Sequence, residues 1–286
     1  MSKLIIAHAN CTDGFTAAWA AYQPGDEVIY ASYGQEPPDV AGKDVVILDF
    51  SYRRDKLIAM HEAANSLLVL DHHESAMYDL EGLSFAKFDM GRSGAMMAWH
   101  HYHPGETSVL VDFVQDRDLY TNALYCTRQV NAFLRWQDKS FERWDELHSM
   151  LLTPSGVQAV AADGQAYETL IKQLVNEASK SPGYAMVPHY EDGKPAITIG
   201  VVNNGPAVGS DLAANLLIKY QDFDAAAIWY QASDGSYRFS LRARRGGINV
   251  AKLAERWGGG GHAGASGFIT QQWPLTVFPY PPEKKA

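Results

Sequence analysis

The amino-acid sequence predicts an α/β protein: an N-terminal parallel sheet with helices on both faces, then a helical connector and a smaller C-terminal α/β domain. Continuous Val/Ile/Leu runs alternate with helical patterns in the first half, which is typical of a parallel sheet covered on both faces. The chain has 286 residues, 47% of them apolar, and this length favours two domains. A long helical pattern that stops at residues 181–183 (Ser-Pro-Gly) separates the two series of elements.

Each element follows from a short run of the sequence. In the first part we expect strands over 4–7, 27–32, 44–50 and 66–70 and helices over 15–22, 53–64, 91–118 and 131–152. A connecting helix follows over 157–179, and then come strands over 197–202, 225–230 and 237–243 and helices over 210–220 and 250–257. The expected division is a domain over 1–152, a connector over 153–183, a second domain over 184–272 and an extended tail over 273–286.

Composition restricts the kind of protein. The formal net charge of -9 argues against binding of long duplex nucleic acid, which depends on many Lys/Arg–phosphate contacts, but not against a short phosphorylated ligand. Cys11 and Cys126 are the only cysteines, so we expect no disulfide framework and a reducing, cytoplasmic setting. No segment approaches the roughly 18 apolar residues of a membrane helix, so we expect no membrane partner.

Metal-type ligands follow three of the expected strands. His8 follows the first, Asp49 ends the third, and Asp71, His72 and His73 follow the fourth. Because the carboxyl ends of parallel strands meet at one edge of a sheet, we expect these side chains to lie close together. Asp and His suit Mn²⁺, Zn²⁺ or Mg²⁺, and a single carboxylate can bridge two cations. The sequence therefore predicts a metal site at this edge.

Three further acidic residues are candidates for the same site. Asp13 lies in the turn after His8, where it could bind a metal or cap the following helix. Asp116 and Asp118 lie near an expected helix end, where acids are poorly placed for the helix dipole. A metal or Arg117 could hold these two acids, or they could be solvated surface charges.

A glycine run marks the second domain. Gly259, Gly260 and Gly261 precede His262, and such a run either ends a helix or forms a nest of backbone N–H groups that binds an anion. Arg242 lies in an expected strand of the same domain, where its guanidinium group could bind phosphate. We therefore predict a phosphate-binding surface here.

Together these motifs resemble the DHH/DHHA1 phosphoesterase superfamily, which includes RecJ-type exonucleases, oligoribonucleases, 3′-phosphoadenosine-phosphate phosphatases, cyclic-dinucleotide phosphodiesterases and exopolyphosphatases. The resemblance spans most of the chain in the order of the family's motifs: His8 to Gly14, Asp49, Asp71 to His73, Ser93 to Ala95, Asp116, Arg242 and Gly259 to His262. The Asp-His-His triplet followed by Gly-Gly-Gly-His is a specific combination.

The resemblance implies a role for each matching residue. The implied metal ligands are His8, Asp13, Asp49, His72 and Asp116, for two ions that are usually Mn²⁺, with Mg²⁺ or Co²⁺ as alternatives. The implied catalytic pair is His73, which would face the scissile phosphate, and Asp71, which would orient the imidazoles. The implied substrate-binding residues are Ser93, Arg242, Gly259, Gly260, Gly261 and His262.

Two departures from the family pattern leave alternatives open. Asn10 stands where the family commonly has an acid, so it is a neutral ligand at best, and Asp118 could replace Asp116. The expected function is hydrolysis of short single-stranded oligonucleotides by two-metal activation of water, in the manner of an oligoribonuclease. The alternatives are action on 3′-phosphoadenosine phosphate, a cyclic dinucleotide or polyphosphate, or non-catalytic nucleotide binding. The oligomeric state stays open.

Overall fold

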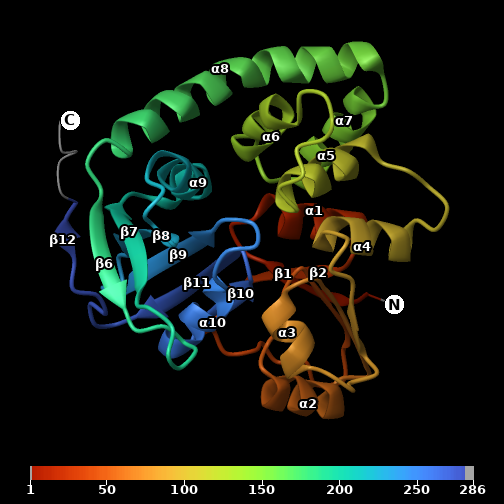
Figure 1. Cartoon of the computed structure of the whole chain (residues 1–286). Helices are drawn as coiled ribbons and strands as arrows, with labels where there is room; N and C mark the ends of the chain where they lie inside the picture. The colour runs from red at the N-terminus through yellow and green to blue at the C-terminus, as the bar shows by residue number, and fades with distance from the viewer. Residues whose placement is uncertain (1, 281–286) are drawn as a thin grey trace. The chain divides into compact units, whose positions relative to one another are not determined.

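A computed structural model describes residues 2–280 of the chain. The chain divides into two compact units, Met1–Glu168 and Thr169–Ala286, which are drawn together in Figure 1 and described here one at a time. Within residues 2–280, none of the helices combines the length and the apolar character needed to cross a bilayer.

The first unit is built on a parallel sheet, as expected, and this sheet has five strands. These are β1 (Leu4–His8), β2 (Glu27–Ala31), β3 (Asp44–Leu48), β4 (Ser66–Asp71) and β5 (Ala86–Phe88), in the order β2-β1-β3-β4-β5. Every neighbouring pair is parallel. The short strand β5 was not expected, since it has only three residues and none is fully buried.

Helices cover both faces of this sheet, which confirms the predicted fold class. Ile5 and Ala7 face one hydrophobic core while Leu4 and Ile6 face another, because side chains alternate along a strand. The first core contains residues of α1 (Thr12–Ala21), α4 (Gly94–Tyr102), α5 (Val109–Asp118), α6 (Thr127–Arg135) and α7 (Phe141–Leu151). The second contains residues of α2 (Arg54–Ala63), with the short helix α3 (Glu74–Asp79) packed against it.

The helical stretch expected over 91–118 is two helices. Each begins at a serine cap: the hydroxyl of Ser93 accepts a hydrogen bond from Met96 N, and that of Ser108 accepts one from Val111 N. Between them Gly105 adopts a φ of +85°, which a helix cannot contain. The break separates α4 from α5 and so determines which residues α5 turns toward the sheet.

The second unit contains a mixed sheet of seven strands. Its order is β10-β11-β9-β8-β7-β6-β12, and β7 pairs with β8 in parallel while the other pairs are antiparallel. The strands are β6 (Gly183–Val187), β7 (Ile197–Asn203), β8 (Ala225–Gln231), β9 (Tyr237–Ala243), β10 (Gly260–His262), β11 (Ala265–Thr270) and β12 (Phe278–Pro279). The helices α9 (Gly209–Lys219) and α10 (Val250–Ala254) and the 3₁₀ turns η1 (Pro206–Val208) and η2 (Glu255–Trp257) complete it.

The glycine run was expected either to end a helix or to form an anion-binding nest, and most of it lies in a β-hairpin. Gly260 to His262 form β10, which pairs with β11. A Cβ at Gly259 would lie 2.1 Å from Gly267 O, and one at Gly261 would lie 2.6 Å from Ala265 O. Close backbone approach within the hairpin therefore requires these two glycines, independently of any ligand.

One long helix, α8 (Pro154–Ala178), contains the boundary between the units. It starts earlier than expected because Pro154 is tolerated in a first helical turn. Val160, in its first half, is fully buried in the core of the first unit. The helix therefore belongs to both units.

Candidate metal centre

The strand order of the first unit creates a crevice between two central strands. β1 lies between β2 and β3, so the chain leaves β1 toward one edge of the sheet and leaves β3 toward the other. At such a switch point the connections diverge, and a crevice opens beyond the carboxyl ends of the strands. His8 ends β1 and Asp49 directly follows β3. The topology therefore places both side chains at the crevice.

Asp49 lies at the centre of the cluster. Its Oδ1 atom is 3.1 Å from His72 Nε2, and its Oδ2 atom is 3.6 Å from His8 Nδ1. The Oδ2 atom is buried and accepts no hydrogen bond from any residue in the described part of the chain. A buried carboxylate oxygen in this state fits a bound cation, because burial without a partner is otherwise unfavourable.

Two groups of ligand atoms meet at Asp49. The ligand atoms of His8, Asp49 and His73 lie within 4.8 Å of one another, and those of Asp13, His72 and Asp118 do so as well. The two oxygens of Asp49 thus face members of both groups. This donor set of carboxylates and imidazoles fits two divalent cations that share one carboxylate.

Asp13 is held by the start of helix α4. Its carboxylate accepts hydrogen bonds from Gly94 N at 2.7 Å and Ala95 N at 3.1 Å, an arrangement that the helix dipole favours. Burial, and then the nearby charges of Asp49 and Asp118, raise the pKa of Asp13 well above its usual value. A cation between these carboxylates would offset their repulsion.

Asp71 holds the backbone of His72 and the ring of His73 in place. Its Oδ1 atom accepts hydrogen bonds from His72 N at 2.7 Å and from His73 Nδ1 at 2.7 Å, while Ser51 Oγ donates to Oδ2 at 2.6 Å. Burial alone would raise the pKa of Asp71, but its contacts with His73 and Ser51 lower it. The bond from Nδ1 of His73 to this carboxylate fixes the orientation of the His73 ring.

The electrostatics of His72 show how much negative charge the cluster holds. Burial alone would lower the pKa of His72, but the carboxylates of Asp49 and Asp118 raise it to about 10. Without a metal the imidazole thus holds a proton as a counter-charge. A divalent cation can take the place of that proton, which is the usual competition at a histidine metal ligand.

The structure corrects the assignment of Asp116. Its carboxylate accepts hydrogen bonds from Ala123 N at 2.8 Å and Leu124 N at 3.0 Å, and two threonine hydroxyls donate to it as well. Asp118 is the alternative metal ligand, and it lies in the cluster with Oδ2 3.5 Å from His72 Nε2. Residues two apart on a helix point in nearly opposite directions, so only one of these two acids can face the site.

Asn10 and Ser93 both have structural roles: Asn10 forms a turn and Ser93 caps a helix. Asn10 adopts a φ of +56° in the turn after β1, a left-handed conformation that Asn tolerates better than most residues. Ser93 is fully buried and caps α4, so its hydroxyl supports the helix that holds Asp13 and does not lie open to a substrate.

The predicted phosphate-binding residues lie in the second unit. Arg242 lies on β9, where its Nη2 atom donates a hydrogen bond to Ser210 Oγ at 2.7 Å and Nη1 donates to Leu241 O at 2.9 Å. His262 lies in the hairpin strand β10. Contact of these residues with a substrate stays a prediction.

Tyr33 is a residue of the site that our sequence reasoning missed. Its ring packs edge-on against His8, with the centroids 5.6 Å apart, and against His73, with the centroids 5.9 Å apart. Burial, and then the carboxylates of Asp71 and Asp49, raise the pKa of its phenol, so the hydroxyl stays protonated. Tyr33 follows β2, so the rule that ligands gather beyond strand ends would have found it.

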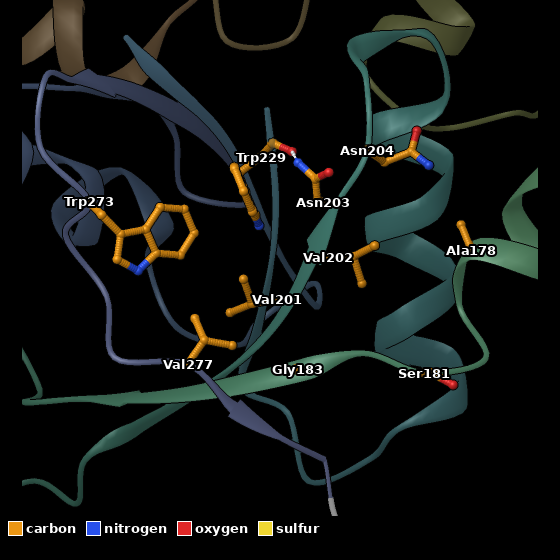
Figure 2. A pocket seen from close by; sticks show the side chains of 10 residues that line it. All are labelled: Ala178, Ser181, Gly183, Val201, Val202, Asn203, Asn204, Trp229, Trp273 and Val277. Atoms are coloured by element: carbon orange, nitrogen blue, oxygen red, sulfur yellow. Dashed lines mark hydrogen bonds between the residues drawn. The ribbon is translucent and has the colours of Figure 1, made fainter. Parts of the chain in front are cut away.

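The second unit contains a shallow hollow of about 580 Å³, shown in Figure 2. Asn203 Nδ2 donates a hydrogen bond to Trp229 O at 3.0 Å at its edge, and Trp273 lies beside Val277. The ten residues that line it are Ala178, Ser181, Gly183, Val201, Val202, Asn203, Asn204, Trp229, Trp273 and Val277. None of these ten side chains is ionisable, so the hollow lacks the groups that phosphoryl chemistry needs.

One protein-family model matches most of the second unit. Residues 194–277 match the DHHA1 domain family. This segment of the C-terminal unit is therefore similar to a DHHA1 domain. With the Asp-His-His triplet and the parallel sheet of the first unit, this match supports the DHH/DHHA1 phosphoesterase superfamily that the motifs resemble.

Three known proteins are similar to this chain. An uncharacterized protein of Acanthamoeba polyphaga mimivirus is 24% identical over 288 residues, and the match covers 92% of this chain but only 66% of that protein's length. The DHH domain of a member of the s1p family of ribosomal proteins aligns with a TM-score of 0.55 at 13% identity, covering 97% of this chain and 83% of the other, which shows a shared fold. A pGpG-specific phosphodiesterase from Vibrio cholerae aligns over 94% of this chain and 93% of its own at 14% identity, with a TM-score of 0.43 that is too low to support an argument.

Proposed function

We propose that this protein is a metal-dependent phosphoesterase that hydrolyses phosphodiester bonds of short oligonucleotides. The observation that carries the proposal is Asp49, whose two carboxylate oxygens face members of two separate ligand groups. Such a shared carboxylate is typical of two-metal phosphoryl chemistry. The DHHA1-like segment in the second unit supports the same class of reaction.

The residues of the first unit divide into two metal-holding sets. His8 and Asp49 would hold one cation, with His73 beside it, and Asp13, His72 and Asp118 would hold the other, with Asp49 shared between them. Mn²⁺ is our first choice for both positions, and Mg²⁺ or Co²⁺ also suit these ligands. Bound cations would supply Lewis-acid catalysis by acidifying a water and neutralising charge on a phosphoryl oxygen.

The protein itself orients the reacting groups. Asp71 fixes the ring of His73 and the backbone of His72, so the site needs little rearrangement when a substrate arrives. We assign His73 to the scissile phosphate beside the first cation. This arrangement provides both the charge and the fixed geometry that attack on phosphorus requires.

The overall charge of the chain favours a short substrate. A net charge of -9 disfavours long duplex nucleic acid, whereas a short single strand needs only a few local phosphate contacts. In the DHHA1-like segment, Arg242, His262 and the glycines 259–261 are the residues that we propose to hold the substrate. A dinucleotide or short RNA therefore ranks ahead of 3′-phosphoadenosine phosphate, a cyclic dinucleotide and polyphosphate.

The test is an activity panel with a matched variant. The wild-type chain is incubated with Mn²⁺ and each of these five substrates, and bound metal is measured by elemental analysis. We expect fastest turnover of the dinucleotide or short RNA, two bound ions, and loss of both activity and metal in Asp49→Asn. Full activity in Asp49→Asn would overturn the two-metal proposal, and polyphosphate as the best substrate would overturn the choice of oligonucleotides.

A further inference from the structure

The loop of residues 119–126, which joins α5 to α6, has an unusual backbone. Tyr120, Asn122 and Cys126 adopt positive φ angles of 58°, 47° and 58°. Left-handed backbone at residues other than glycine is unfavourable, and it persists only where the surroundings impose it. Such strain gathers at binding and catalytic sites, and this loop begins directly after the proposed metal ligand Asp118.

Asp116 is the group that holds this loop in place. Its carboxylate accepts hydrogen bonds from Ala123 N at 2.8 Å and Leu124 N at 3.0 Å, and its backbone oxygen accepts one from Asn122 N at 3.0 Å. The hydroxyl of Thr121 also donates to the carboxylate, at 2.6 Å. The loop is thus fixed to the same helical turn that presents Asp118 to the metal cluster.

This fixed loop exposes apolar side chains. Tyr125 is 86% exposed, Tyr120 is 50% exposed and Leu124 is 42% exposed. The guanidinium group of Arg117 lies over the Tyr120 ring, 5.1 Å from its centroid. The Oδ1 atom of Asn122 is buried and accepts no hydrogen bond from the residues that the structure describes. The exposed aromatic rings and the nearby cation together form a surface suited to a planar ligand.

We propose that the 119–126 loop binds a nucleobase of the substrate, with the exposed ring of Tyr125 stacked on the base. The proposal rests on the proposed function and names what selects the substrate of that same site. Stacking on tyrosine accepts any base, which suits an enzyme that acts on short strands of any sequence. A substrate without bases would gain nothing from this loop, so the loop favours oligonucleotides over polyphosphate.

The test compares a dinucleotide with its abasic counterpart, using the full-length chain and Mn²⁺. Tyr125→Ala should lower kcat/KM for the dinucleotide by about 5- to 150-fold, mainly through KM, because one stacking contact is lost. Hydrolysis of the abasic dinucleotide should not change. Tyr125→Phe should retain the wild-type KM. The matched control is Tyr78→Ala on α3, a tyrosine that is 66% exposed and should have no effect.

The outcomes separate this inference from the function on which it rests. If Tyr125→Ala slows both substrates equally, or slows neither, nucleobase binding by the loop is wrong while the phosphoesterase proposal survives. If the wild-type chain cleaves no substrate, the proposed function fails, and calorimetric binding of a non-hydrolysable dinucleotide then decides the loop's role. Weaker binding in Tyr125→Ala would support the loop as a base-binding surface, and unchanged binding would overturn it.

Discussion

Asp116 and Asp118 lie two residues apart on α5, yet their surroundings are opposite. Hydrogen bonds to Asp116 lower its pKa to about 2 even though burial alone would raise it. Burial and the charge of Asp49 instead raise the pKa of Asp118. The surroundings of Asp116 therefore favour its charged form, whereas those of Asp118 disfavour it.

This contrast predicts opposite effects of two similar substitutions. Asp118→Asn should lower the number of bound Mn²⁺ ions and reduce activity by about 100-fold, since a metal ligand is lost. Without metal this variant should unfold at the same or a higher urea concentration than the wild type. Asp116→Asn should instead lower the free energy of unfolding by about 1–3 kcal/mol through lost hydrogen bonds. Equal metal loss in both variants would contradict the assignment of Asp118, and not Asp116, as the metal ligand.

Asp26 gives a prediction about acid stability away from the metal centre. Burial alone would raise the pKa of Asp26, but hydrogen bonds from Lys3 and Gln23 lower it below its usual value. A carboxyl group whose pKa is lower in the folded state stabilises that state. This stabilisation is complete above the unfolded-state pKa of about 3.9, and it is lost as the pH falls through the folded-state pKa. Asp26→Asn should therefore cost about 1 kcal/mol at pH 7 and less at pH 3, measured by urea unfolding. An equal difference at both pH values would contradict this.

At the scale of elements, the approach of α4 to β3 determines where Asp49 lies. Gly94 is the first residue of α4, and a Cβ there would lie 2.3 Å from Asp49 Cβ and 2.8 Å from Asp49 Cα. No rotamer change can relieve contact with these atoms, because both belong to or adjoin the backbone. The helix can hold Asp13 this close to Asp49 only because residue 94 is glycine.

Gly94→Ala should therefore displace Asp49 and weaken Mn²⁺ binding while costing about 1–3 kcal/mol of stability. The matched control is Gly209→Ala, also at the first residue of a helix, where the nearest atom to a new Cβ would be 3.7 Å away. That variant should keep full metal binding and near-wild-type stability. Calorimetric Mn²⁺ titration and thermal unfolding of both variants check this. Unimpaired Mn²⁺ binding in Gly94→Ala would refute the role given to this glycine.

The sequence predicted those elements whose pattern is local. The apolar runs of β1, β3 and β4 identify buried strands, and residues at their ends form the site because parallel strands share one carboxyl edge. The hairpin strands β10 and β11 were missed because their glycines show no strand-like alternation. The choice between Asp116 and Asp118 depended on how α5 is rotated about its own axis. That rotation follows from the break at Gly105 and from packing between distant segments, which a local sequence pattern does not reveal.

At the scale of the whole molecule, the two ligand groups around Asp49 come entirely from the first unit, Met1–Glu168. We therefore predict that a chain shortened to residues 1–178, which keeps all of α8, binds Mn²⁺ with the stoichiometry of the full chain. It should lose most of its activity on a dinucleotide, because the DHHA1-like segment is absent. Elemental analysis and circular dichroism check the first point and an activity assay the second. A folded fragment that binds no Mn²⁺ would show that the second unit contributes ligands.

Under the two-metal proposal, the crowding of Asp13, Asp49 and Asp118 would link the lifetime of the protein to its metal supply. A ligand that binds only the folded state stabilises it in proportion to the logarithm of its free concentration, by about 2.7 kcal/mol at a hundredfold excess over Kd. When Mn²⁺ is scarce, the repelling carboxylates leave a larger fraction of molecules transiently open, and open molecules are what proteases cleave. The abundance of this protein in a cell would then follow manganese availability even where its synthesis is constant.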